Sequence, residues 1–385
     1  MTKQKVVTKI GGLLVLGLVS VRAFGQDTMT MEEMRAKLEE MKSQMDGMSE
    51  TQQTMLTDVG NLKKLKVSGY IQARYEEHQD HPVDATTPGA TADKQDSFAI
   101  RRGRIKFTYT ANPTSQYVIY PDLSTKDGVT LKEAYVKLTE PWTGTGINLV
   151  FGQQNWFFGR EIERSSSIRE FPERSRVFGK AVFDGERDKG ARIEFPDLIT
   201  PGLNLKAGIF NGNGIKSPQT FDNDKYKHTM GRLAYSLGWL DLGVSGEYAR
   251  RFALTSSGNA NTAKKHIGAD AFFYYELPVA GGGSLGGEWL KGEGVQSPAA
   301  LQARNQGYFI SEVQNLGDLF QLAARYDVYD PDLDVDGDAI HTTTLAGNYF
   351  WDDNVRLTLA WEHPVTVGFN EVKDDTKTLQ FQYKF

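Results

Sequence analysis

The amino-acid sequence predicts an all-β protein, namely a transmembrane antiparallel β-barrel of about 16 strands preceded by a short α-helical coiled coil. Three observations support this prediction. Apolar and polar residues alternate with a period of two from Lys66 onward, and the first 25 residues resemble a secretory signal. The chain also combines 39 Gly, 21 Phe, 16 Tyr and 6 Trp with a mean hydropathy of −0.46. Half-polar strands explain that combination better than a large buried core does.

The charge balance and the missing cysteines exclude several functional classes. The 44 Lys and Arg residues face 49 Asp and Glu residues, so the formal net charge is −5 and no nucleic-acid partner is expected. The chain has no Cys, which excludes disulfides, thiolate metal sites and a cysteine nucleophile. We expect no cofactor.

Residues 1–25 are predicted to be a signal peptide. Lys3, Lys5 and Lys9 precede an apolar run over residues 10–21, and Ala23-Phe24-Gly25 supplies small residues for cleavage. The alternative is a membrane anchor, but a spanning helix needs about 20 apolar residues. The exported mature chain is then expected in the cell outer membrane.

Residues 26–63 are predicted to form a periplasmic coiled-coil segment. Apolar residues recur at alternating steps of three and four if Gln52 is counted as a polar core position, and the seam comprises Met31, Met34, Leu38, Met41, Met45, Met48, Met55, Val59 and Leu62. So narrow an apolar seam requires a partner helix, which favours self-association. The alternative is an amphipathic helix that lies on its own protein.

Residues 66–385 are predicted to form the barrel. The alternating runs start near residues 66, 98, 115, 130, 146, 187, 203, 227, 240, 264, 282, 304, 318, 339, 354 and 375. Short connections alternate with long ones, at 77–97, 154–186, 211–226, 251–263, 329–338 and 364–374, as in outer-membrane barrels. The alternative, a soluble β-sandwich or propeller, fits the export signal and the polar alternate faces less well. The last strand ends at Phe385, and we expect it to engage the barrel assembly machinery.

The stretch from Val150 to Phe195 carries a series of short motifs. They are Gly152-Gln153, Phe158-Gly159-Arg160-Glu161, Ser165-Ser166, Phe171-Pro172-Glu173-Arg174-Ser175 and Arg187-Asp188-Lys189-Gly190. In order and spacing, this series resembles the phosphate-selective porin O and P family, as do Arg101-Arg102-Gly103-Arg104 and Lys132-Glu133-Ala134-Tyr135-Val136. One departure is Trp156-Phe157, where the family more often has Lys-x-Pro-Phe. This change is expected to narrow the constriction or to remove a basic contact.

The resemblance implies a homotrimer in outer-membrane lipid, with a loop at 154–186 that folds into the lumen and forms the constriction. The apolar residues of that loop are expected to pack against the barrel wall: Phe157, Phe158, Ile162, Ile168, Phe171, Val177 and Phe178. Its basic residues then line the remaining opening. They are Arg160, Arg164, Arg169, Arg174, Arg176 and Lys180, with Arg187 beside them.

Strand periodicity adds a second set of cations. If Ile105, Phe107 and Tyr109 face lipid, then Arg102, Arg104 and Lys106 face the lumen, because Cβ directions alternate. Stacked cations attract anions, and a guanidinium binds phosphate bidentately. The predicted function is therefore passive diffusion of small hydrophilic solutes with a preference for phosphate or other small anions. Many lumen acids accompany these cations, so a general, non-selective porin remains an alternative, as does an envelope-tethering barrel that acts through the coiled coil.

Other motifs do not support catalysis. Asp332, Asp334 and Asp336 with Gly337 match the start of a calcium loop, but position twelve is Thr343 instead of Glu, so an acidic surface turn is the preferred interpretation. No Gly-x-Ser-x-Gly motif is present and the six His residues are scattered. We therefore expect a protein that is not an enzyme.

Overall fold

The computed structural model describes residues 30–81, 93–125, 128–179, 182–183, 186–212, 214–215, 225–255, 258–295, 303–368 and 375–385. The predicted signal peptide lies outside these residues. The chain divides into two compact units, Met1–Lys63 and Lys64–Phe385.

The described part of the first unit is one helix, α1 (Met31–Lys63). Thr30 and Glu33 form a capping box at its start: the Glu33 side chain accepts the Thr30 N–H at 2.8 Å, and Thr30 Oγ1 accepts the Glu33 N–H at 3.3 Å. The described apolar side chains of the predicted seam are solvent-exposed, including Met45 at 68% and Leu62 at 69%. The side chain of Met34 lies outside the description. Among the residues described, no helix has the length and apolarity to cross a membrane.

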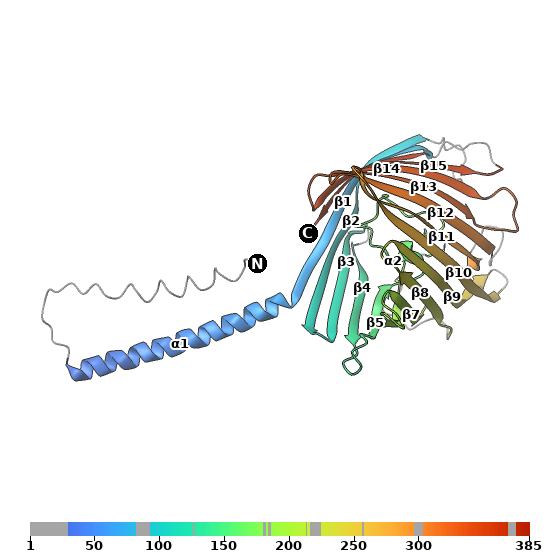
Figure 1. The fold of residues 1–385 in the computed structure, drawn as a ribbon. Coiled ribbons are helices and arrows are strands. Elements are labelled where there is room, and N and C mark those ends of the chain that lie inside the picture. The colour runs from blue at the N-terminus through green and yellow to red at the C-terminus, as the bar shows by residue number, and fades with distance from the viewer. Residues whose placement is uncertain are drawn as a thin grey trace. The chain divides into compact units, whose positions relative to one another are not determined.

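The second unit is a closed antiparallel barrel in which each strand pairs with its neighbours in sequence (Figure 1). Its strands are β1 (Leu65–His81), β2 (Asp93–Asn112), β3 (Ser115–Thr125), β4 (Gly128–Thr139), β5 (Asn148–Asn155), β6 (Arg187–Phe195), β7 (Leu203–Phe210), β8 (His228–Ser236), β9 (Leu240–Thr255), β10 (Gly258–Leu277), β11 (Gly281–Val295), β12 (Ala303–Leu316), β13 (Phe320–Asp330), β14 (Ile340–Phe350), β15 (Val355–Thr366) and β16 (Thr376–Lys384). A short helix, α2 (Gly159–Glu163), lies between β5 and β6.

The first and last strands close the barrel. β1 pairs with β16 from Tyr70↔Lys384 to His78↔Thr376, and Gly69 and Phe385 exchange both backbone hydrogen bonds at 2.9 and 3.0 Å. Closure removes the sheet edges, whose unpaired backbone groups lipid could not satisfy.

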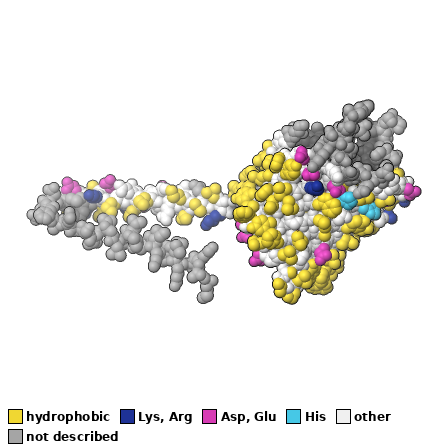
Figure 2. All heavy atoms as spheres, turned by 90° about the horizontal axis from the view of Figure 1, so that it is seen from above, with side chains coloured by type: hydrophobic (Ala, Val, Ile, Leu, Met, Phe, Trp, Pro, Cys, Tyr) yellow, Lys and Arg dark blue, Asp and Glu magenta, His cyan; other side chains and the backbone are white. Residues whose placement is uncertain are grey.

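The two faces of the strands differ as the period of two predicts. Along β16, Phe381 and Tyr383 are exposed on the outer face, whereas Gln380 and Gln382 are buried on the inner face. Hydrophobic side chains cover much of the barrel face shown in Figure 2. The predicted all-β fold and its strand count are thus confirmed.

Two connections differ from the prediction. Residues 251–263 were expected to be a long loop, but β9 and β10 continue as a hairpin with a pairing at Thr255↔Gly258. Likewise β1 runs to His81 and β2 starts at Asp93 inside the segment predicted as loop. Hydrophobic alternation marks only the part of a hairpin that meets lipid. Strands that continue beyond it in water carry no such pattern, so the sequence underestimates their length.

Candidate functional site

The described residues of the loop, 156–179 and 182–183, lie against the inner face of the barrel wall. Trp156, Phe157, Phe158, Ile162 and Phe178 are each at most 2% exposed, and they pack in one cluster with inward-facing residues of β7 to β13. Those wall residues are Phe210, Met230, Phe272, Leu290, Phe309 and Tyr329. A loop that remained in water would leave these rings exposed, so burying them fixes the segment inside the barrel.

Wall glycines make room for the rings. A Cβ at Gly268, on the inner face of β10, would lie 2.8 and 2.9 Å from two ring carbons of Phe158. A Cβ at Gly307, on the inner face of β12, would approach Val177 just as closely. Side chains at these two positions would hold the loop away from the wall.

Glu288 of β11 holds the start of α2. Its carboxylate accepts the backbone N–H groups of Arg160, at 3.1 Å, and Glu161, at 2.5 Å, and Ser245 Oγ accepts the N–H of Gly159 at 3.0 Å. These N–H groups have no partner within the helix, so the wall satisfies them. The loop is therefore fixed by polar contacts as well as by ring packing.

Two of the predicted packing residues behave differently from the main group. Ile168 is 51% exposed, so the prediction that it packs against the wall is wrong. It lies in the turn that follows Ser165, whose carbonyl oxygen accepts the Ile168 N–H. Phe171 is buried, but in a second cluster with Val313, Ala323 and Ala346.

The opposite side of the loop meets β1 and β2. Arg104 Nη1 donates to Tyr70 OH at 2.9 Å and to Ser166 Oγ at 3.2 Å, and its Nε pairs with Asp122 at 2.7 Å. Gln72 donates to the Ser166 carbonyl oxygen at 3.1 Å. Ser166 of the motif series thus lies where the loop contacts the cationic wall, which is the inner face of β1 and β2 with Arg102, Arg104 and Lys106.

Glu173 is the acidic centre of this wall. Its carboxylate pairs with Arg74 at 3.0 Å, Arg101 at 2.7 Å and Arg102 at 3.0 Å. Burial alone would raise the pKa of Glu173, but the surrounding arginines, Arg102 foremost, outweigh burial and hold it below its usual range. Arg74 also pairs with Glu76 at 3.0 Å. Two carboxylates therefore face three guanidinium groups, which leaves one positive charge in excess.

Two further predicted cations share an acid next to this cluster. Lys106 lies 3.5 Å from Glu133 and Arg187 lies 3.2 Å from the same carboxylate. Arg187 also contacts Glu186 at 3.4 Å. The Lys106 side chain remains 33% exposed, whereas that of Arg187 is 9% exposed. Of these two cations, Lys106 is therefore the more accessible.

The predicted loop cations differ in their partners. Arg160 pairs with Asp241 at 2.6 Å, and Arg164 pairs with Glu170, with contacts of 2.6 and 2.8 Å. Arg176 donates to Thr342 at 3.0 Å, and its side chain remains 35% exposed.

Arg174 and Arg169 are both buried within the loop. Arg174 pairs with Glu186 and donates to the Glu161 and Ile162 carbonyl oxygens. Arg169 is 4% exposed, and its Nε and Nη1 have no hydrogen-bond partner among the described residues. Lys180 lies outside the described residues. The nine described cations of the ten predicted thus fall into an accessible group and a group that supports the loop.

The Asp-rich turn carries no cation cage in the part of the chain that the structure describes. Asp334 pairs with Arg304, and Asp332 Oδ1 accepts the Asp334 N–H at 3.2 Å, so these oxygens organise the turn. Asp336 is exposed.

Some contributors were not singled out from the sequence. Arg74 and Tyr70 follow the inward phase of β1, so the period of two could have found them. The joint role of Glu173 could not be found in this way, because the loop around it has no period.

Comparisons with known proteins agree with this architecture. A family model described as "Phosphate-selective porin O and P" matches residues 66–270. No curated protein sequence matches the chain. Among solved structures, the anion-selective porin from Comamonas acidovorans superposes with a TM-score of 0.58 at 14% identity, covering 83% of this chain and 99% of its own.

Two further solved structures share the fold. OmpF of Salmonella typhi, solved in complex with daunomycin, has a TM-score of 0.60 at 11% identity, covering 83% of this chain and 97% of its own. The in-vitro folded OmpT of Vibrio cholerae in its trimer form has a TM-score of 0.56 at 12% identity, covering 83% and 99%. At these identities the likeness establishes the fold alone.

Proposed function

Because the chain belongs to the phosphate-selective porin O and P family, we propose that this outer-membrane porin passes small hydrophilic solutes passively and prefers anions such as phosphate. Family and fold indicate a channel rather than an enzyme. The finer proposal, anion preference, rests on one observation. Arg74, Arg101 and Arg102 share Glu173, and even with Glu76 beside Arg74 the three cations outnumber the two carboxylates.

Electrostatics at this wall supplies the selectivity. A cation near a narrow aqueous path raises the local concentration of anions and lowers that of cations, and the effect is screened over about 8–10 Å at physiological salt. Lys106 and Arg101 retain exposure of about one third, so they can attract a passing anion. Arg101 suits a phosphate because a guanidinium donates hydrogen bonds in pairs, and the ammonium group of Lys106 on the same strand adds a positive charge.

The test is the reversal potential of single channels in a potassium chloride gradient, followed by phosphate competition against chloride current. We expect an anion-selective potential and inhibition by phosphate. Arg102→Gln should reduce selectivity, whereas Arg304→Gln, an equal charge change at an exposed residue paired with Asp334, should not. A neutral or cation-selective potential in the wild type would refute the anion preference and favour the general porin.

The exposed seam of α1 supports a second proposal, self-association of residues 26–63 in the periplasm after removal of residues 1–25. Met45 and Leu62 have no cover among the described residues, and apolar seams of this spacing associate as coiled coils. The in-vitro folded OmpT described as a trimer makes a homotrimer the state to test first. An envelope tether would use the same seam with a different partner.

Deleting residues 27–62 separates these readings. Under the homotrimer proposal, the deletion lowers the trimer fraction measured by light scattering in detergent and leaves single-channel conductance unchanged. If the deletion variant has the same trimer fraction as the wild type, the seam has no role in trimer assembly. The envelope-tether proposal then remains for the seam. A separate variant truncated in the strand that ends at Phe385 tests whether the assembly machinery needs this strand.

A further inference from the structure

A groove of about 650 Å³ lies on the outer face of β8 to β11. Outward-facing residues of these strands line it, among them Tyr248, Lys265, Ile267 and Lys291. The groove is separate from the lumen, so it has no part in the proposed solute path.

The strand register explains the groove. One cross-strand row runs Gly231↔Gly246↔Ile267↔Lys291. The row above it runs Thr229↔Tyr248↔Lys265↔Glu293, and the row below it runs Leu233↔Val244↔Ala269↔Trp289. Two adjacent glycines surrounded by larger side chains leave a depression in the wall.

The glycines of the floor are not required by packing. A Cβ at Gly246 would meet nothing closer than the His266 carbonyl oxygen at 3.9 Å, and a Cβ at Gly231 nothing closer than the Lys206 carbonyl oxygen at 3.9 Å. This contrasts with Gly268, where a Cβ would meet the Phe158 ring at 2.8 Å. The wall could therefore carry side chains at Gly231 and Gly246, and their absence leaves space on the lipid side.

Cations gather at one end of the groove. Lys291 is exposed and Lys265 pairs with Glu293 at 2.9 Å. Arg250 donates to Tyr248 OH at 3.1 Å and lies over the Tyr226 ring, as Lys225 does. The acid Glu293 neutralises one of these cations, Lys265, and leaves Lys291 and Arg250 beside it. The end of the groove is thus positively charged.

These cations lie at the height of lipid headgroups. At roughly 3.4 Å per residue and a tilt of about 45°, Lys291 is roughly 24 Å along the barrel axis from Gly281, where β11 begins. The apolar band of such barrels is about 25 Å tall. The aromatic side chain of Tyr248 lies in the same cross-strand row as Lys265, and that of Trp289 lies in the row below Lys291, as in an interfacial girdle. The cationic end is on the side of the long loops, which face the outside.

We propose that this groove binds a phosphorylated lipid of the outer leaflet, with a phosphate between Lys265 and Lys291 and one acyl chain over Gly231 and Gly246. Charge complementarity selects the phosphate, and the depression gives the chain more contact than a flat wall would. The site does not depend on which solute the barrel passes.

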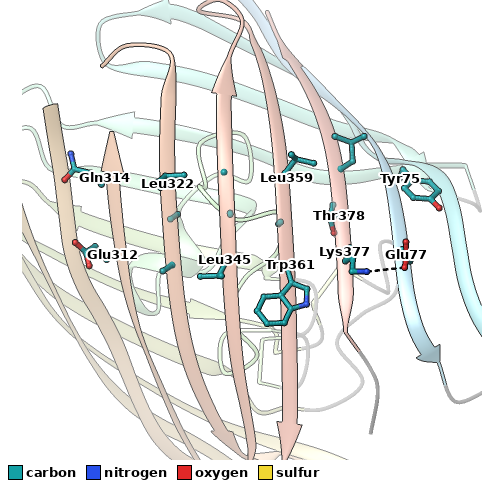
Figure 3. A pocket seen from close by; sticks show the side chains of 16 residues that line it. Tyr75, Glu77, Glu312, Gln314, Leu322, Leu345, Leu359, Trp361, Lys377 and Thr378 are labelled. Atoms are coloured by element: carbon teal, nitrogen blue, oxygen red, sulfur yellow. Dashed lines mark hydrogen bonds and ion pairs between the residues drawn. The ribbon is translucent and has the colours of Figure 1, made fainter. Parts of the chain in front are cut away.

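A larger groove on β12 to β16 and β1 serves as the comparison (Figure 3). Its volume is about 780 Å³ and its floor includes Gly347, where a Cβ would meet nothing closer than Leu322 at 3.9 Å. Its rim carries Glu312, and its lysine, Lys377, pairs with Glu77 at 3.4 Å. This rim has no surplus of cations, so the anionic lipid should favour the first groove.

The test uses the purified protein in non-ionic detergent. It is titrated with diphosphoryl lipid A as the probe and, separately, with phosphatidylcholine as the neutral lipid. Native mass spectrometry counts the bound lipid. We expect the phosphorylated lipid to bind and the neutral lipid to bind weakly. Lys291→Gln should lower the affinity about fivefold, the usual effect of one cation near an anionic surface. Lys377→Gln is the matched control and should leave the affinity unchanged.

A second pair of variants tests the chain-binding part. Gly246→Leu fills the first groove and should lower the affinity, whereas Gly347→Leu fills the other groove and should not. Unchanged conductance of each variant shows that the barrel is folded. Equal affinity of wild type and Lys291→Gln, equal loss with Lys377→Gln, or equal binding of phosphatidylcholine would each overturn the proposal. Should Gly246→Leu fail to fold, the two lysine variants still decide it.

Discussion

Replacing Gly268 by Ala tests whether the glycine holds the constriction loop in place. The added Cβ would lie 2.8 and 2.9 Å from the Phe158 ring and 2.9 Å from the Trp289 carbonyl oxygen. Ordinary contacts of this kind are about 3.4 Å or longer, so the ring must retreat by roughly 0.6 Å. Phe158 is 0% exposed and packs against Phe183 with ring centroids 5.0 Å apart, which leaves it little room.

The expected cost is that of overpacking a dense core, about 1–3 kcal/mol of unfolding free energy. The loop can relieve the overlap by moving away from the wall. Because Phe158 shares one cluster with Trp156, Phe178 and Phe183 of the same loop, such a movement should alter single-channel conductance as well as stability.

Denaturant unfolding and single-channel recording measure the two effects. Gly246→Ala is the matched control, since its Cβ would meet nothing closer than 3.9 Å, and it should change neither quantity appreciably. Adding Phe158→Leu to Gly268→Ala should restore part of the lost stability, although the contact with the Trp289 carbonyl oxygen remains. If Gly268→Ala matched Gly246→Ala in both measurements, Gly268 would not be needed to make room for the Phe158 ring, and the reasoning would be wrong.

Three further predictions concern the charges. Glu173→Gln removes the carboxylate shared by Arg74, Arg101 and Arg102, so the reversal potential should become more anion-selective; a shift toward cations would contradict the assignment. Since the arginines hold the pKa of Glu173 below its usual range, its ion pairs should persist as pH falls from 7 to 5 and be lost only in stronger acid. An anion selectivity that rises between pH 7 and pH 5 in the wild type but not in Glu173→Gln would show that Glu173 is protonated in this range, against the prediction. Arg169→Met removes a buried guanidinium whose Nε and Nη1 have no hydrogen-bond partner among the residues that the structure describes, so it should be neutral or stabilising in denaturant unfolding. A loss of unfolding free energy above about 3 kcal/mol would contradict this expectation.

The barrel could be predicted because one physical rule repeats along the chain. A strand between lipid and water must alternate, and residues such as Phe381 and Gln382 report that alternation directly. The inward direction of Arg102 and Arg104 follows from the same rule.

The contacts of the loop could not be predicted in this way. Glu173 meets three arginines from β1 and β2 because the loop folds back across the barrel, and no period records that path. Ile168 shows the same limit, since an apolar residue in an irregular segment can point toward a wall or away from it. Gly268 matters because it makes room for the Phe158 ring, and this contact depends on strand register.

The pairing of β1 with β16 determines the order in which the molecule can be completed. β1 can pair with β16 only after the last strand has been synthesised, so the β1–β16 junction at Tyr70 and Lys384 must be the last to form. Until then both edge strands present unpaired backbone groups, which lipid cannot satisfy and which neighbouring chains can. Contacts this distant in sequence also form slowly. The folding intermediate that precedes closure therefore has an open β1–β16 junction. Any factor that guides folding has to shield these two strand edges.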